Sequence, residues 1–140
     1  MVYNFMLKNV NYFLFIVSQK NWEIIKSDKI IGTDNQKTFK KIMSNDKILV
    51  YINGISEIKA LYNVIEKYED HDQLFIDRNY PYRFKINEIE FFDEKIDFKE
   101  LVHKLKFIKN KDKWYTHIGG LKGATQISLR DYTALIKALV

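Results

Sequence analysis

The 140-residue sequence contains no cysteine, one proline and three histidines. The lack of cysteine excludes disulfide bonds, zinc–thiolate sites, iron–sulfur clusters and cysteine nucleophiles together. The histidines, His71, His103 and His117, are scattered and show no metal-ligand spacing, so we expect no metal site. We also expect no cofactor, because the sequence has no glycine pattern typical of nucleotide binding.

Long hydrophobic runs are also missing. The longest unbroken run, Tyr12–Val17, has six residues, whereas a membrane-spanning helix needs about 20. No small-residue cleavage site follows this run. These absences predict a soluble, cytoplasmic protein that does not associate with a membrane.

The residues that are present are typical of a globular domain. Hydrophobic residues make up 46% of the chain, aromatic residues 15% and charged residues 29%, a balance far from that of disordered chains. A chain of this length forms one domain and buries about two thirds of its unfolded surface. We predict an N-terminal extension over residues 1–10 and a single domain over residues 11–140.

Positive charge is concentrated in one segment. The chain has 23 Lys and Arg against 18 Asp and Glu, a net charge of +5. Lys104–Lys113 holds five lysines and one acid and so carries most of that excess, whereas the preceding Glu88–Glu100 is acidic. Such segregation is expected when one face of a protein meets an anion. A lysine-rich composition without any anionic partner is the alternative.

Hydrophobic patterning predicts four strands, at residues 12–17, 47–52, 58–65 and 82–87. The apolar positions change parity after the fourth strand, which predicts a bulge or tight bend near Asn87.

Helical signals lie between and after these strands. Ser18 can cap a helix over residues 19–26, and Ser128 opens a last helix with Asp131 as a variant capping box. A helical period also runs from Phe98 to Leu105, whereas residues 33–41 have no apolar period and indicate a polar loop. Together these elements predict an α+β fold, a mixed β-barrel or strongly twisted sheet of about five to six strands with peripheral helices.

Two motifs give little support for catalysis or phosphate binding. Gly119, Gly120 and Gly123 precede no Gly-Lys-Ser/Thr motif, so they indicate either a turn that needs positive φ or a backbone left bare for a ligand. His117 is the one histidine with a suggestive setting, beside Trp114. A structural or ligand-stacking role outweighs a catalytic one for it.

Aromatic residues interleaved with basic ones are the informative feature. Trp22 follows Lys20 and Asn21, and Trp114 closes the lysine-rich segment. Tryptophan stacks on any base, while lysine and arginine pair with phosphates. The pattern therefore favours a nucleic-acid ligand, and burial of both tryptophans in the core is the alternative.

Several segments together resemble the EVE domain, a family of the PUA-like superfamily related to YTH and ASCH domains. The resemblance covers roughly Asn11 to Leu139. It is carried by Asn21-Trp22-Glu23, Gly32, Asp46 and Lys47 with Tyr51, Tyr80–Ile86 (YPYRFKI), Leu105–Trp114 (LKFIKNKDKW), and Asp131-Tyr132. The family resemblance implies a barrel-like mixed sheet and a concave pocket that accepts a flipped or unpaired base, often a modified one, beside basic residues that hold the phosphate backbone.

The composition and the resemblance indicate the same site residues. A pocket that reads a base needs hydrogen-bonding groups beside a stacking plane. We expect Ser18, Asn21 and Trp22 on one side, and Trp114 and His117 on the opposing wall. Tyr51 is expected to form the floor of the pocket or to be a core residue. The candidate phosphate ligands are Lys20, Arg83, Lys109, Lys111 and Lys113.

These expectations favour a non-catalytic reader of modified or unpaired bases in RNA or DNA. A second possibility is an ASCH-like amidohydrolase acting on a modified nucleoside with Lys, Thr and Glu. The chain offers Lys20 and Thr33 for that role, but no Glu at a suitable spacing. A third is a protein-interaction module of a defence or toxin–antitoxin system, in which the lysine-rich segment binds an acidic partner.

Overall fold

The computed structural model describes residues 9–118 and 123–140. Within these residues the strands are β1 (Tyr12–Val17), β2 (Ile30–Thr33), β3 (Lys47–Ile52), β4 (Glu57–Glu69), β5 (Tyr82–Phe91) and β6 (Ala124–Ile127). The α-helices are α1 (Gln19–Asp28), α2 (Gln36–Lys41) and α3 (Leu129–Leu139), and short 3-10 turns are η2 (Phe98–Glu100), η3 (Val102–Lys104) and η4 (Trp114–His117). None of the helices in this part of the chain is long and apolar enough to cross a membrane.

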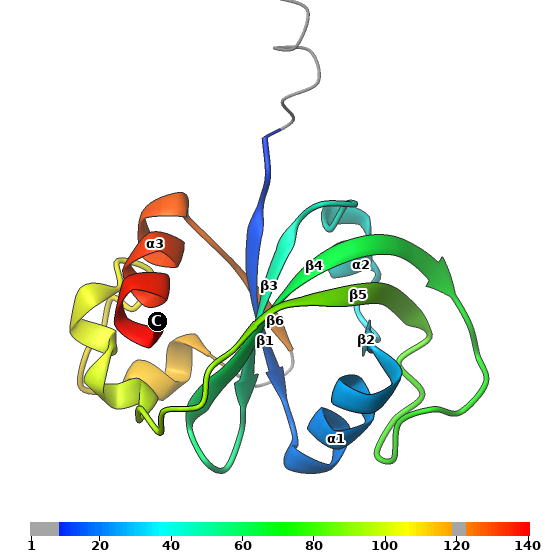
Figure 1. Cartoon of the computed structure of the whole chain (residues 1–140), viewed down its shortest axis with the longest axis horizontal. Coiled ribbons are helices and arrows are strands. Elements are labelled where there is room, and N and C mark those ends of the chain that lie inside the picture. Colours follow the sequence, from blue (N-terminus) through cyan, green and yellow to red (C-terminus); the bar gives the residue numbers. More distant parts are fainter. Residues whose placement is uncertain (1–8, 119–122) are drawn as a thin grey trace, which may run out of the picture.

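The six strands form one mixed sheet in the order β2-β5-β4-β3-β1-β6. β1 runs parallel to β3, and the other neighbouring strands are antiparallel. The sheet is strongly curled, with α1 and α2 on one side and α3 with the 3-10 turns on the other (Figure 1). The predicted mixed, twisted sheet with peripheral helices is therefore confirmed.

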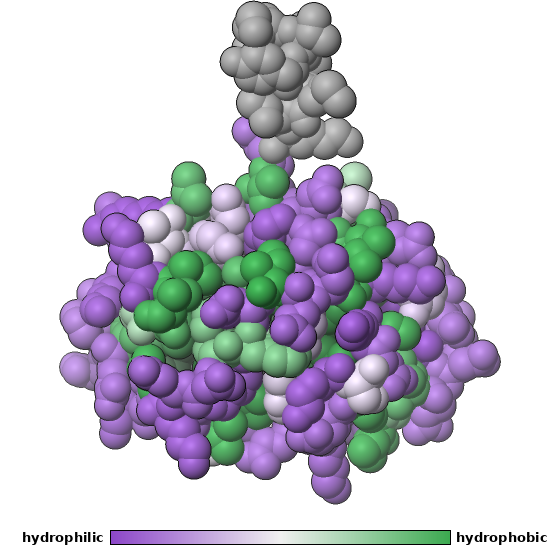
Figure 2. All heavy atoms as spheres, viewed as in Figure 1, coloured by the Kyte–Doolittle hydropathy of each residue, from purple (hydrophilic) through white to green (hydrophobic). Residues whose placement is uncertain are grey.

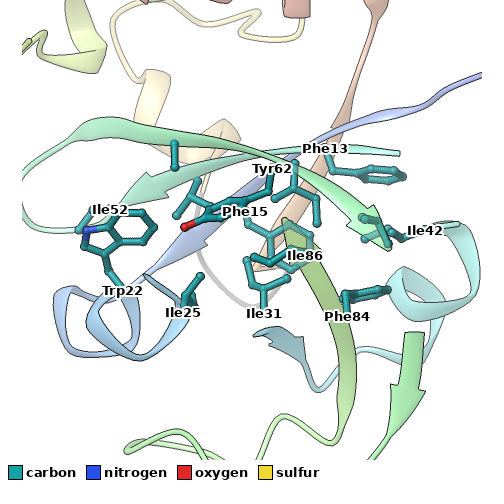
Figure 3. Close-up of a cluster of buried hydrophobic side chains, with 14 of the residues drawn as sticks. Phe13, Phe15, Trp22, Ile25, Ile31, Ile42, Ile52, Tyr62, Phe84 and Ile86 are labelled. Atoms are coloured by element: carbon teal, nitrogen blue, oxygen red, sulfur yellow. The ribbon is translucent and has the colours of Figure 1, made fainter. Parts of the chain in front are cut away.

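The sheet buries a hydrophobic cluster on each face. Side chains alternate along a strand, so Phe13 and Phe15 of β1 join the cluster under α1 while Leu14 joins the cluster under α3. Figure 3 shows the first cluster, in which Trp22 and Ile25 of α1 pack on the sheet. This two-sided burial explains why β1 is apolar throughout. On the face shown in Figure 2, hydrophilic side chains surround hydrophobic ones that gather toward the middle.

Serine side chains fix the starts of the two longer helices. The Ser18 hydroxyl accepts a hydrogen bond from the Asn21 amide at 3.1 Å, and Ser128 accepts one from Asp131 at the same distance. Both predicted caps are confirmed. α1 extends two residues beyond its predicted end and stops at Lys29, which adopts a left-handed conformation with φ 58°.

The prediction of a loop over residues 33–41 was wrong. The segment contains the end of β2 and all of α2, whose N-terminus is capped by the Asn35 side chain. α2 has six residues and fully buries none of them, so it produces no apolar period. Residues 98–105, predicted to be helical, form two 3-10 turns instead, although their apolar side chains are buried as expected.

The β4–β5 pair contains two irregularities. Tyr62 pairs with Glu88 and Leu61 with Glu90, which leaves Ile89 as an extra residue. This is the irregularity predicted near Asn87, displaced by two residues. A second shift leaves Ile65 extra on β4, and β4 continues past its predicted end to Glu69. Bulges increase local twist, which is consistent with the curl of these two strands.

Candidate functional site

A cavity of about 190 Å³ lies at the carboxyl end of β1, and we call it the β1–β2 pocket. It is lined by the end of β1 with Ser18, by Asn21 of α1, by Gly32–Asp34 and by Gly123. The segment between β4 and β5, residues 70–81, contributes the remaining wall with Phe75, Asp77, Arg78 and Tyr80. The pocket thus brings together residues 15–21, 32–34, 75–80 and 123.

A hydrogen-bonded chain crosses this pocket. Asn21 donates through Nδ2 to Asp77 Oδ1, and the Tyr80 hydroxyl donates to Asp77 Oδ2, both at 2.8 Å. Only the nitrogen of an amide can donate to a carboxylate, so the orientation of the Asn21 amide is fixed. Its Oδ1 is buried and has no hydrogen-bond partner among the described residues.

These hydrogen bonds shift the pKa values of Asp77 and Tyr80. Partial burial raises the pKa of Asp77, but hydrogen bonds from Asn21, Tyr80 and backbone amides outweigh it, so the pKa lies below its usual value. Burial, the bond to Asp77 and its negative charge raise the pKa of Tyr80 to about 12. At neutral pH, Asp77 is therefore a carboxylate acceptor and Tyr80 keeps its proton.

Two aromatic rings lie beside the polar chain. Phe75 and Tyr80 meet edge to face with centroids 5.4 Å apart. A Cβ at position 32 would lie 2.9 Å from Tyr80 Cβ and 3.0 Å from its carbonyl oxygen. Gly32 is therefore required for the 70–81 segment to approach β2. Tyr80 itself has a φ of 44°, a strained conformation for a bulky residue.

Arg83 holds the 70–81 segment in place. It is 3% exposed and donates to the carbonyl oxygens of Tyr80 and Asn79, both at 3.2 Å, and of Asp72. Its Nη1 also lies 3.6 Å from Asp70 Oδ2. The structure corrects the prediction that Arg83 binds phosphate, because the guanidinium is buried and occupied by this segment.

A second cavity, of about 400 Å³, adjoins the first and shares Ser18 and Asp77 with it. We call it the Tyr51 cavity, since Tyr51 lines it together with Asn53 and Tyr115. The Tyr51 hydroxyl donates to Ser56 Oγ at 3.1 Å, and burial raises its pKa. Tyr51 is thus a core residue that lines this neighbouring cavity and is not among the described residues that line the β1–β2 pocket.

A third cavity, of about 740 Å³, lies between α2 and β6, and we call it the seam groove. Its described lining is Asn35, Lys37, Thr38, Lys41, Phe107, Thr116, His117, Ala124, Thr125 and Gln126. His117 therefore faces the seam groove and not the β1–β2 pocket, and its Nε2 accepts a hydrogen bond from the Asn110 amide at 3.1 Å.

The structure does not bring the two tryptophans together. Trp22 is 9% exposed and packs edge to face against Tyr62 and Phe91, whereas Trp114 packs against Phe98 in the cluster on the other face of the sheet. Neither is among the described residues that line the three cavities. The prediction that Trp22 and Trp114 lie on opposing walls of one pocket is therefore corrected.

The lysines predicted to bind phosphate differ in their surroundings. Lys20, Lys109 and Lys113 are exposed. Lys111 is exposed as well, but its ammonium group donates to the carbonyl oxygens of Leu105 and Ile108 and so closes this loop.

The predicted glycine-rich turn is described only in part. Gly119 and Gly120 lie outside the described residues. Gly123 has a φ of 63° and lines the β1–β2 pocket, which is consistent with both uses expected of it.

Sequence reasoning identified Ser18 and Asn21 but missed the 70–81 segment. Its aromatic and acidic residues, Phe75, Asp77 and Tyr80, fit no helical or strand period. A signal was available, because two aromatic rings in a polar connection are unusual, and such connections carry function more often than core elements do.

Comparison with known proteins identifies the family. The EVE domain matches residues 11–138. A UPF0310 protein of Pyrococcus horikoshii is 30% identical over 148 residues, covering 94% of this chain and all of the relative. A UPF0310 protein of Pyrococcus abyssi is 32% identical over 146 residues, with the same coverage.

Solved structures share the fold at low identity. The Pho92 YTH domain in complex with m6A has a TM-score of 0.63 and 16% identity, covering 94% of this chain and 84% of that one. The Mmi1 YTH domain in complex with RNA has a TM-score of 0.66 and 11% identity, covering 94% and 78%. The fold is therefore the PUA-like α+β fold of YTH domains, and the sequence match over nearly the whole chain shows that this protein belongs to the EVE domain family.

Proposed function

We propose that this protein is a non-catalytic nucleic-acid-binding module that holds a modified or flipped base in the β1–β2 pocket. The observation that carries the proposal is the Asn21–Asp77–Tyr80 hydrogen-bond chain beside the rings of Phe75 and Tyr80. A base presents a hydrogen-bonding edge and a stacking face, and proteins that read unpaired bases offer a partner to each.

The size of the pocket suits a single base. An apolar cavity of about 150 Å³ accommodates benzene, so a cavity of about 190 Å³ has room for one flat ring system and not for a base pair. The base must therefore leave its stack before it enters.

The polar groups favour a base edge that donates. Each oxygen of the Asp77 carboxylate can accept more than the one side-chain hydrogen bond it receives, and Asp34 adds a second carboxylate to the lining. An exocyclic amino or methylamino group would match these acceptors. The YTH neighbours in complex with m6A and with RNA support this assignment at the level of fold.

The alternative amidohydrolase is less well supported. Of the Lys, Thr and Glu set that such an enzyme would use, only Thr33 is among the described residues that line the pocket.

Calorimetric titration with a panel of modified and unmodified nucleosides, beginning with m6A, tests the proposal. We expect saturable binding with no new product by chromatography. Tyr80→Ala removes the half-buried ring that lines the pocket and should weaken binding by the value of one stacking contact, about 1 to 3 kcal/mol. Asp77→Ala, at an exposed position of the same pocket, provides a second variant that should also weaken binding.

Ile76→Ala is the matched control, since Ile76 follows Phe75, is 59% exposed and does not line the pocket. It should bind like the wild type. The proposal fails if no nucleoside binds, if a nucleoside is converted to product, or if both folded pocket variants bind like the wild type.

A further inference from the structure

The seam groove continues the β1–β2 pocket along the open side of the curled sheet. Gly32–Asp34 line the pocket, and the chain continues directly into Asn35–Lys41, which contributes one wall of the groove. On the other side Gly123 lines the pocket and Ala124–Gln126 line the groove. Both walls therefore pass from the pocket to the groove without a break in the chain.

The two cavities differ in charge. Asp34, Asp77 and Arg78 line the β1–β2 pocket, a balance of one negative charge, whereas the described residues that line the groove include two lysines and no Asp or Glu. Lys37 and Lys41 are four residues apart on α2, and residues at this spacing lie on the same face of a helix. Their ammonium groups concentrate positive charge along one wall.

The neutral polar side chains in the groove are those of Asn35, Thr38, Thr116, Thr125 and Gln126. The Thr116 hydroxyl donates to the Lys113 carbonyl oxygen at 2.7 Å, so Thr38 and Thr125 are the hydroxyl donors for a ligand. His117 adds a donor, because its Nε2 accepts from the Asn110 amide, and the neutral ring then carries its proton on Nδ1. Lysine together with hydroxyl, amide and imidazole donors is the usual set for phosphate and sugar contacts, which position a nucleic acid without reading its sequence.

We propose that the seam groove binds the phosphate backbone of a single strand whose flipped base occupies the β1–β2 pocket, with Lys37 and Lys41 as the principal phosphate ligands. This inference rests on the proposed function of the pocket. It places the main electrostatic contact on α2 and not on the lysine-rich segment at Lys104–Lys113.

The test compares two probes, the m6A nucleoside and a single-stranded RNA with one central m6A. In the double variant Lys37→Gln/Lys41→Gln we expect weaker binding of the RNA and unchanged binding of the nucleoside. The slope of log affinity against log salt should fall by about 1.4, because each phosphate on a single strand contributes about 0.7. The control Lys99→Gln/Lys104→Gln removes the same charge from two exposed lysines outside the groove and should keep the wild-type slope.

The outcomes separate the two proposals. The groove assignment is overturned if Lys37→Gln/Lys41→Gln keeps the wild-type salt slope, or if the control pair flattens it equally, while Asp77→Ala still loses the nucleoside. The pocket assignment is overturned if RNA binding depends on Lys37 and Lys41 but Asp77→Ala changes neither probe. Both fail if the wild type binds neither of these probes nor any other nucleoside of the panel.

Discussion

Tyr62 carries a buried hydroxyl that the core does not satisfy. The residue is 1% exposed, and the hydroxyl has no hydrogen-bond partner among the described residues. The ring meets Trp22 and Phe91 edge to face, and Figure 3 shows its oxygen directed toward Trp22. Burial, and then the charge of Glu88, raise the pKa of Tyr62 to about 12. An unpaired buried polar group costs about 1 to 3 kcal/mol.

We expect Tyr62→Phe to raise the free energy of unfolding by about 1 kcal/mol at pH 7, because it removes this unpaired group. The pKa of tyrosine is ordinarily 10.0, whereas the pKa of Tyr62 in the folded protein is about 12. At a pH between these two pKa values, the Tyr62 hydroxyl is deprotonated in the unfolded chain but still protonated in the folded protein. The stability of the wild type therefore falls as the pH rises through this range. Tyr62→Phe has no hydroxyl at this position, so its free energy of unfolding should not show this part of the alkaline decrease.

Urea unfolding at pH 7 and over an alkaline series checks both expectations. Tyr115→Phe is the control, since Tyr115 is exposed. A destabilised Tyr62→Phe at pH 7 would mean that the hydroxyl contributes a favourable contact.

Single residues show where sequence reasoning stops. Alternation along β5 predicted Arg83 on the exposed side with Lys85, and that prediction was wrong because the 70–81 segment folds over Arg83. Asn21 was expected near a pocket, but its partner Asp77 is 56 positions away. Partners at such separations are set by the tertiary fold and leave no local pattern.

Asp131 connects α3 to the 3-10 region at the scale of elements. The sequence predicted a capping box, in which its carboxylate would return to the backbone of Ser128. The carboxylate instead accepts from the amides of Lys106 at 2.9 Å and Phe107 at 3.0 Å, and the residue is 1% exposed. It therefore ties the helix to a segment 24 to 25 positions earlier.

Asp131→Ala should lower the free energy of unfolding by about 3 kcal/mol, because hydrogen bonds to a charged group contribute about 1.5 to 3 kcal/mol each and two amides lose their acceptor. The comparison is Ser128→Ala, which removes only the cap and should cost about 1 kcal/mol. Urea denaturation measures both. Equal losses in the two variants would contradict the connecting role of Asp131.

Length and periodicity decided which elements were predictable. β1 and β3 are unbroken apolar runs and were predicted with their observed bounds, and the start of α3 was predicted from its Ser128 cap. β2 and β6 have four residues each, too few to show alternation. The spacing of the apolar residues from Phe98 to Leu105 would place them on one side of an α-helix. Over so short a run, 3-10 turns place them on one side almost equally well, so the spacing does not distinguish the two kinds of helix.

At the scale of the whole molecule, the two hydrophobic clusters share β1, β3 and β4. The loss of either cluster exposes one face of the same strands, so we expect both to unfold together. Trp22 reports on one cluster and Trp114 on the other.

Single-tryptophan variants test this coupling. In Trp22→Phe the fluorescence comes from Trp114, and in Trp114→Phe it comes from Trp22. Within each variant the fluorescence and far-UV circular dichroism transitions should coincide in urea. A fluorescence transition that precedes the loss of secondary structure in either variant would show that its cluster unfolds separately.

The position of β1 between β3 and β6 affects how the protein folds during its synthesis. β1 and β6 are paired neighbours, yet residues 18–123 separate them. Ribosomes add roughly 5 to 20 residues per second, so β6 follows β1 by on the order of 5 to 20 s. Until then the outer edge of β1 has no partner, and unpaired edges invite pairing with other chains. A nascent chain of this protein therefore presents its most apolar strand as an open edge, and is most vulnerable to aggregation, just before the last strand leaves the ribosome.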